Sequence, residues 1–180
     1  MIEESTTEEI QMSVSTRLKT MAAATTRALL VGCTLLAGIA VAQHAAAQQP
    51  IPHNHLYPEI GSAQANINAA LAEAKRTHKR VLLDFGGDWC GDCQVLDIYF
   101  HQAPNAELLE NNFIKVNINI GRMDANIDIA KRYGVPIHGV PALAVVDANG
   151  KVIVAQDKEF ADMRHMQPTS VTEFLTKWKR

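Results

Sequence analysis

Short apolar runs alternate with amphipathic helical patterns along residues 62–180, and this order is what most constrains the fold. Residues 147–150 (DANG) predict a hairpin turn, which would lead into a further short strand at 151–154. Strands separated by helices form a parallel sheet, and a closing hairpin adds an antiparallel edge. We therefore predict an α/β domain with a small mixed sheet flanked by helices. The three strands expected before the hairpin turn are residues 80–85 (RVLLDF), 113–118 (FIKVNI) and 142–146 (ALAVV).

Five helices are expected between and around these strands. A first helix precedes the sheet, with Ser62 as its cap, and the second begins near Cys90 at the end of the first strand. A third is short, residues 105–110, and a fourth covers 124–133 and ends at Gly134. The last begins at a cap offered by Thr169 and Ser170. The apolar positions of the first and last helices are Ile67, Ala70, Leu71 and Ala74, and Val171, Phe174, Leu175 and Trp178.

The first 47 residues have the layout of a cleaved secretory signal peptide. A fifteen-residue apolar run, Ala28–Ala42, follows basic residues and precedes the small residues Ala45–Ala47. A membrane span needs about 20 apolar residues, so an uncleaved anchor is the alternative rather than the expectation. Four glutamates near Met1 favour Met12 or Met21 as the start. We expect export, to the periplasm of a Gram-negative bacterium, and a loop at residues 48–61 before the folded domain, residues 62–180.

Cleavage after residue 47 would remove Cys33 and leave Cys90 and Cys93 as the cysteines of the mature chain. Two cysteines are too few for a disulfide-stapled scaffold, so their C-x-x-C spacing carries the information. At the start of a helix, unpaired backbone N–H groups and the helix dipole favour the thiolate of Cys90. Cys93, one turn later, is expected to be less exposed and to resolve the mixed disulfide that Cys90 forms.

Four motifs in the same order as in a known family extend the match beyond the cysteines. They are LLDF followed by WCGDC (82–85 and 89–93), KVNIN (115–119), YGV followed by GVP (133–135 and 139–141), and NGK (149–151). From Arg80 to the C-terminus the chain resembles the thioredoxin superfamily, in particular bacterial exported thioredoxin-like proteins. The resemblance implies a thioredoxin fold with an extra N-terminal helix, thiol–disulfide oxidoreductase activity, and no cofactor besides the Cys90–Cys93 disulfide.

The resemblance also implies roles for five residues around the cysteines. Asp84 takes the position of a buried carboxylate that accepts the proton of the resolving thiol, directly or through water, and Lys115 that of its partner. Pro141 matches a cis-proline that faces the disulfide, and the backbone of Val140 would pair with the substrate chain. Trp89 would shield the cysteines and contact substrate. The alternatives are a solvated carboxylate for Asp84, an exposed lysine for Lys115 and core packing for Trp89.

Two departures from the family pattern bear on the redox properties, and Gly91, Asp92 and His138 are the residues expected to tune them. Asp92 replaces the usual proline between the cysteines, where its charge would oppose thiolate formation at Cys90. That would favour the disulfide and give a more reducing couple than a histidine there, unless Asp92 faces solvent. The longer loop at residues 136–138 places His138 either near the active site or in solvent.

These observations favour an enzyme that exchanges dithiols and disulfides with exported proteins, acting as a reductant and served by a membrane or periplasmic redox partner. A net charge of −2 gives no reason to expect nucleic acid, and we expect a monomer. No zinc site is expected, since a Cys₄ set is incomplete and no histidine has finger-like spacing. A metallochaperone for copper or a haem-assembly partner, using the same thiolates with His138 or the Met163, His165 and Met166 group, stays open.

Overall fold

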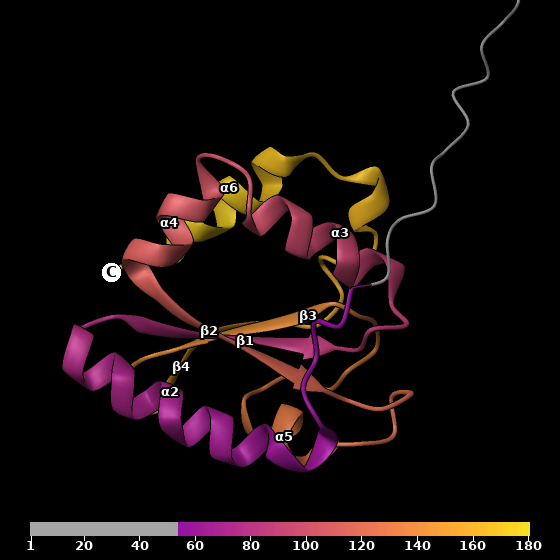
Figure 1. The fold of residues 1–180 in the computed structure, drawn as a ribbon, viewed down its shortest axis with the longest axis horizontal. Coiled ribbons are helices and arrows are strands. Elements are labelled where there is room, and N and C mark those ends of the chain that lie inside the picture. The colour runs from indigo at the N-terminus through magenta and orange to yellow at the C-terminus, as the bar shows by residue number, and fades with distance from the viewer. Residues whose placement is uncertain (1–53) are drawn as a thin grey trace, which may run out of the picture. The chain divides into compact units, whose positions relative to one another are not determined.

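A computed structural model describes residues 54–180. Within this range, four strands form one sheet in the order β2-β1-β3-β4 (Figure 1). The strands are β1 (Arg80–Gly86), β2 (Phe113–Asn119), β3 (Ala142–Val146) and β4 (Val152–Gln156). β1 pairs with β2 in parallel, and with β3 antiparallel, and β3 pairs antiparallel with β4. The predicted mixed sheet is confirmed. The predicted signal peptide, residues 1–47, lies outside the described residues.

The direction of β3 differs from the expectation that strands separated by helices run parallel. β3 begins where β1 ends, with Ala142 opposite Phe85. The helix between β2 and β3, α5 (Ile127–Arg132), has six residues. Such a helix spans about 9 Å, whereas returning along a seven-residue strand requires about 23 Å. The chain therefore stays at the carboxyl end of β1 and enters β3 in the antiparallel direction.

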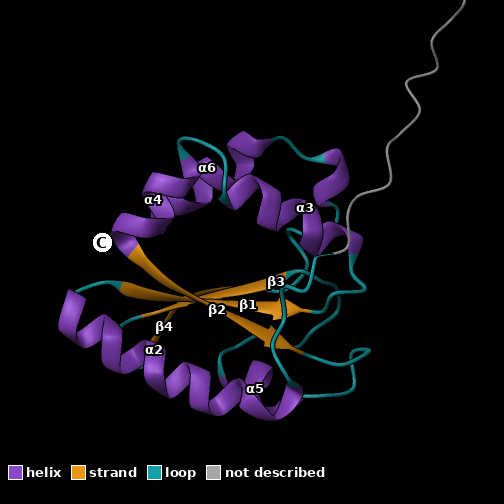
Figure 2. Cartoon of the chain, viewed as in Figure 1, coloured by secondary structure: helices purple, strands orange, loops and turns teal. Residues whose placement is uncertain are grey.

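Helices cover both faces of the sheet (Figure 2). α2 (Ala63–Thr77) and α5 lie on one face, and α3 (Gly91–Phe100), α4 (Asn105–Asn112) and α6 (Pro168–Trp178) lie on the other. Two 3₁₀ turns, Ile60–Ser62 and Met163–His165, were not predicted. α2 is the expected extra N-terminal helix. No helix within residues 54–180 has the length and hydropathy to cross a membrane.

Each face of the sheet has its own apolar core, as the alternation of side chains along a strand requires. Val81, Leu83 and Phe85 of β1 belong to the core under α2 and α5. Leu82 belongs to the core under α3 and α6, together with Phe100 and the C-terminal helix residues. Because Asp84 shares the face of Leu82, the alternation directs its carboxylate toward the α3 layer.

α2 begins after Ser62 as predicted, but its cap and the first residues of α5 and α6 differ from the expected ones. The hydroxyl of Ser62 donates to the carbonyl of Glu59 at 2.7 Å instead of capping α2. α5 begins only at Ile127, because Asn126 has a left-handed conformation with φ of 55°. α6 begins at Pro168, after the N-cap residue Gln167, so the predicted Thr169 and Ser170 cap is wrong. Proline suits the first turn of a helix, where its missing N–H costs nothing.

Candidate active site

A disulfide joins Cys90 and Cys93 at the N-terminus of α3. Cys90 is the N-cap residue, and its sulfur accepts a hydrogen bond from the backbone N–H of Cys93 at 3.1 Å. In the reduced protein the same N–H would stabilise a thiolate on Cys90. Cys90 is 4% exposed and Cys93 is 1% exposed. The structure thus places Cys93 deeper than Cys90, the order that attack by Cys90 and resolution by Cys93 require.

Asp84 is buried at the carboxyl end of β1, on the face that α3 covers. Its Oδ1 accepts a hydrogen bond from the hydroxyl of Tyr57 at 3.0 Å, and its Oδ2 lies 3.7 Å from Nζ of Lys115. Burial raises the pKa of this carboxyl, although Lys115 and the Tyr57 hydroxyl act in the opposite direction. Asp84 is therefore neither solvated nor a simple ion-pair partner, and its environment suits a proton acceptor.

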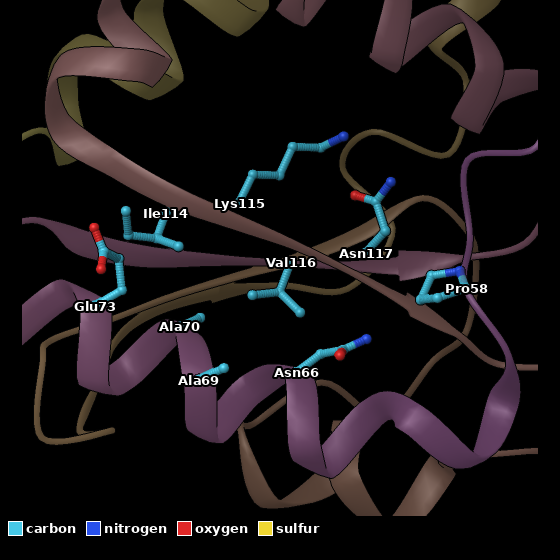
Figure 3. A pocket seen from close by; sticks show the side chains of 9 residues that line it. All are labelled: Pro58, Asn66, Ala69, Ala70, Glu73, Ile114, Lys115, Val116 and Asn117. Atoms are coloured by element: carbon cyan, nitrogen blue, oxygen red, sulfur yellow. The ribbon is translucent and has the colours of Figure 1, made fainter.

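Lys115 links two carboxylates. Its Nζ lies 3.0 Å from Oδ1 of Asp97, closer than to Asp84, and its side chain is 15% exposed. Figure 3 shows Lys115 and Asn117 projecting from β2 away from α2, whereas Val116 points toward α2. The same view contains an open groove along the outer edge of β2, with Pro58 at one end and α2 as its wall. Lys115 thus reaches the site from the sheet edge, and Asp97 is a partner that sequence reasoning missed.

Tyr57 is a buried residue of the site that the sequence did not predict. Its side chain is 1% exposed and packs with Cys90 and Cys93 in a small apolar cluster. Trp89, Val140 and Leu56 are half-buried neighbours of this cluster. Tyr57 lies in a segment that the sequence indicates only as a proline-containing loop. Nothing local distinguishes it, because its partner Asp84 is 27 positions away.

Two side chains near the cysteines hold the segment that carries Tyr57. The Oδ1 of Asp88 accepts the backbone N–H groups of Leu56 at 2.8 Å and Tyr57 at 2.9 Å. Gln94 accepts the N–H of Asn54 and donates to its carbonyl, at 3.0 and 2.9 Å. Burial would raise the pKa of Asp88, but the two N–H groups and His55 outweigh it and lower that pKa. Tyr57 is thus anchored through its backbone as well as its ring.

The loop before β3 lies beside the cysteines. The Val140–Pro141 peptide bond is cis, and the carbonyl oxygen of Val140 lies 3.7 Å from Sγ of Cys90. Trp89 is half-buried beside the disulfide, where its indole N–H donates to the carbonyl of Gly121 at 2.5 Å. The guanidinium of Arg122 stands 5.3 Å from the Trp89 ring centre. The structure brings Trp89, Val140 and the cysteines together, as the resemblance implied.

Asp92 does not face solvent, because it is 7% exposed. Its Oδ1 accepts hydrogen bonds from the backbone N–H and Nε of Arg164, at 3.0 and 3.1 Å. Gly91, the first residue of α3, lies next to the same side chain, since an added Cβ would stand 3.9 Å from Cδ of Arg164. The charge of Asp92 is therefore matched by a cation from the turn before α6, which sequence reasoning did not identify.

His138 and the Met163, His165 and Met166 group have separate contacts and do not come together as one set of metal ligands. The exposed ring of His138 bonds through Nδ1 to Oδ2 of Asp157 at 2.5 Å. Met163 is buried in the core under α3, and exposed His165 pairs with Asp162. Within residues 54–180, no three or more histidine, cysteine, aspartate or glutamate side chains gather in a way that could hold a metal ion.

Comparisons with known proteins agree with this fold. A family model for thioredoxin-like proteins matches residues 62–148. The crystal structure of a disulphide isomerase from Xylella fastidiosa is 38% identical, with a TM-score of 0.65, over 69% of this chain and 96% of that one. An H-type thioredoxin from Chlamydomonas reinhardtii is 31% identical over 53% of this chain and 82% of that protein.

A third relative is much longer than this chain. The thiol:disulfide interchange protein DsbD of Salmonella typhi is 30% identical over 54% of this chain, but the match spans only 17% of that protein. The redox-active C-x-x-C disulfide lies within the fold that these relatives share. The chain therefore belongs to the thioredoxin superfamily.

Proposed function

We propose that this protein reduces disulfides in exported proteins, with Cys90 as the nucleophile and Cys93 as the resolving thiol. The observation that carries the proposal is the buried Cys90–Cys93 disulfide at a helix N-terminus. The buried carboxylate of Asp84 is linked to it through Tyr57, and the Val140 carbonyl lies beside Cys90 Sγ. Export is supported by the signal-peptide pattern of residues 1–47. A relative named thiol:disulfide interchange protein fits such a role.

The reaction has two exchange steps. The Cys90 thiolate attacks one sulfur of a substrate disulfide, and the other substrate sulfur leaves as a thiolate that takes a proton from water. Cys93 then loses its proton toward Asp84 and attacks Cys90 Sγ, which releases the second substrate sulfur with the electron pair of the broken bond. The substrate gains two electrons and two protons, and the Cys90–Cys93 disulfide forms. A dithiol partner in the membrane or periplasm must then reduce this disulfide.

Substrate would bind where the disulfide meets the Val140–Pro141 loop. The main chain of Val140 is the group best placed to pair with an extended substrate segment, because its carbonyl already lies beside Cys90 Sγ. The half-buried Trp89 ring, which packs against the same cysteine cluster, offers a flat apolar surface. Lys115 would act through Asp84 by holding that carboxylate in place.

The reducing direction rests on the surroundings of the Cys90 sulfur. Among residues 54–180, the groups within hydrogen-bonding distance of this sulfur are the backbone N–H of Cys93 and the carbonyl of Val140, and no basic side chain is one of them. A thiolate without a cationic partner gains little stabilisation, so the disulfide form is favoured. Asp92 adds to this preference less than its sequence position suggests, because Arg164 offsets its charge.

Four measurements test the proposal. Equilibration of the purified protein with a defined thiol buffer should give a potential near that of thioredoxin, about −270 mV, and a value near −120 mV would indicate a disulfide donor instead. A Cys93→Ser variant produced with the full chain should retain exported proteins as mixed disulfides, whereas the matched Cys90→Ser variant should retain none. Protein recovered from the producing bacterium should begin at Gln48. Light scattering should give the mass of a monomer.

A further inference from the structure

The hydroxyl of Tyr57 is hydrogen-bonded to the buried carboxylate of Asp84 and lies near the resolving cysteine, Cys93. It donates to Oδ1 of Asp84 at 3.0 Å. A Cβ added to Gly86 would collide with this hydroxyl and also with Sγ of Cys93, 2.8 Å away. The oxygen and the sulfur therefore flank the same point beside Gly86. Tyr57 is also 1% exposed and packs directly with both cysteines.

The arrangement leaves little room for a direct proton transfer from Cys93 to Asp84. One carboxylate oxygen of Asp84 is occupied by the Tyr57 hydroxyl, and the other faces Lys115 at 3.7 Å. The space that a side chain at position 86 would fill is taken by the tyrosine hydroxyl and the sulfur. A buried hydroxyl that donates to a carboxylate still has a free acceptor lone pair. The sulfur of Cys93 flanks the same point beside Gly86 as this oxygen, so its thiol proton is the donor expected to face the free lone pair in the reduced protein.

We propose that the Tyr57 hydroxyl relays the proton of Cys93 to Asp84 in the resolving step. As Cys93 attacks Cys90 Sγ in the mixed disulfide, its S–H proton moves to the tyrosine oxygen while the tyrosine's own proton moves to Oδ1 of Asp84. The Cys90–Cys93 bond forms, and the bond from Cys90 to the substrate sulfur breaks. That sulfur leaves with the electron pair and takes a proton from water. Tyr57 ends neutral, and Asp84 ends protonated.

The charges around the hydroxyl suit a relay rather than a base. Burial, together with the carboxylates of Asp84, Asp97 and Asp88, raises the pKa of Tyr57, so it does not ionise by itself. It can pass a proton only when it receives one at the same time. Burial also raises the pKa of Asp84, which makes that carboxylate a better acceptor near neutral pH. Lys115 forms ion pairs with both Asp84 and Asp97, and so places a cation next to these two carboxylates.

The segment before α2 keeps the hydroxyl in place. Two backbone N–H groups, those of Leu56 and Tyr57, bind the carboxylate of Asp88, and the side-chain amide of Asn117 donates to the carbonyl of Leu56 at 2.8 Å. The ring position is thus set from both sides of the segment. A relay needs such a fixed geometry, because proton transfer falls off steeply when donor and acceptor separate.

The inference rests on the proposed roles of Cys90 and Cys93, and the test separates the two. The reduced full chain is mixed with 5,5′-dithiobis(2-nitrobenzoate) in a stopped-flow instrument. Attack by Cys90 releases the first thionitrobenzoate, and resolution by Cys93 releases the second. If the proposed roles of the cysteines fail, the parent protein lacks two ordered phases. Tyr57→Phe, Asp84→Asn and their double variant are compared with the parent.

The matched control is Tyr99→Phe, which removes a hydroxyl that bonds to the carbonyl of Met166 at 3.2 Å. At about pH 6, Tyr57→Phe should slow the second phase at least about 10-fold and leave the first within about 2-fold. The double variant should be no slower than the slower single variant, because a relay acts as a unit. Near pH 10, where a thiol ionises without help, the difference should vanish.

Four results would count against the relay. The first is a second phase in Tyr57→Phe equal to the parent at pH 6. The second is an equal slowing at every pH, which would assign Tyr57 a packing role. The third is a fully additive double variant, which would mean that Tyr57 and Asp84 act separately. Slowing of the same size in the Tyr99→Phe control would likewise count against a role specific to Tyr57.

Discussion

Replacing Gly86 by alanine should strongly destabilise the oxidised protein. The added methyl carbon would lie 2.7 Å from Cζ of Tyr57 and 2.8 Å from Sγ of Cys93. Ordinary contacts between such atoms lie at about 3.5 to 4.0 Å. Both neighbours are almost fully buried, at 1% exposed each, so neither can move without disturbing the site.

The size of the effect follows from two limits. If the neighbours shift slightly, overpacking costs about 1 to 3 kcal/mol. If Tyr57 is expelled, the loss approaches that of truncating a buried aromatic ring, about 3 to 5 kcal/mol. We therefore expect the free energy of unfolding to fall by about 2 to 4 kcal/mol, measured by urea unfolding of the oxidised protein under two-state conditions. In a Tyr57→Ala background the cost of Gly86→Ala should fall by at least about 1 kcal/mol.

The matched control is Gly61→Ala, because an added Cβ at Gly61 meets no atom within 4 Å. Its effect should stay within about 0.5 kcal/mol, the usual range for an exposed position. A cost of Gly86→Ala no larger than that of this control would refute the expected collision. An equal cost in the presence and absence of the Tyr57 ring would refute it as well, since collision with the ring would then not be the cause.

Other perturbations of the site have equally definite expectations. Asp92→Asn should raise the reduction potential and Arg164→Gln should lower it, each by about 10 to 30 mV in a thiol buffer, and shifts of the same sign would refute the charge pairing. Burial raises the pKa of Asp84 above its usual 3.8, so stability falls as pH rises from that value to the raised one. Across this pH interval, the free energy of unfolding of Asp84→Asn, measured by urea unfolding, should rise relative to that of the parent. A pH-independent difference would argue against a raised pKa of Asp84. Gln94→Leu should lower the free energy of unfolding by about 1 to 3 kcal/mol and remove hydrogen-exchange protection at Asn54. Retained protection at Asn54 would show that Gln94 does not anchor this segment.

The sequence alone determined those features that depend on neighbouring residues. The apolar runs of β1 and β3 and the stripe of α2 are local patterns, and the structure contains all of them. The C-x-x-C motif follows a strand and opens a helix, so its thiols were identifiable from spacing and context. The order of the motifs from Arg80 onward was enough to identify the superfamily.

The tertiary structure decided what depends on residues far apart in the chain. Asp92 was expected to act by its charge on Cys90, but it meets Arg164, which is 72 positions away. Tyr57 reaches Asp84 from a segment with no local pattern of its own. β3 runs antiparallel because α5 is too short to carry the chain back along the sheet. Periodicity and spacing are encoded within a few residues, whereas these contacts exist only after the whole sheet and its two helical layers have packed.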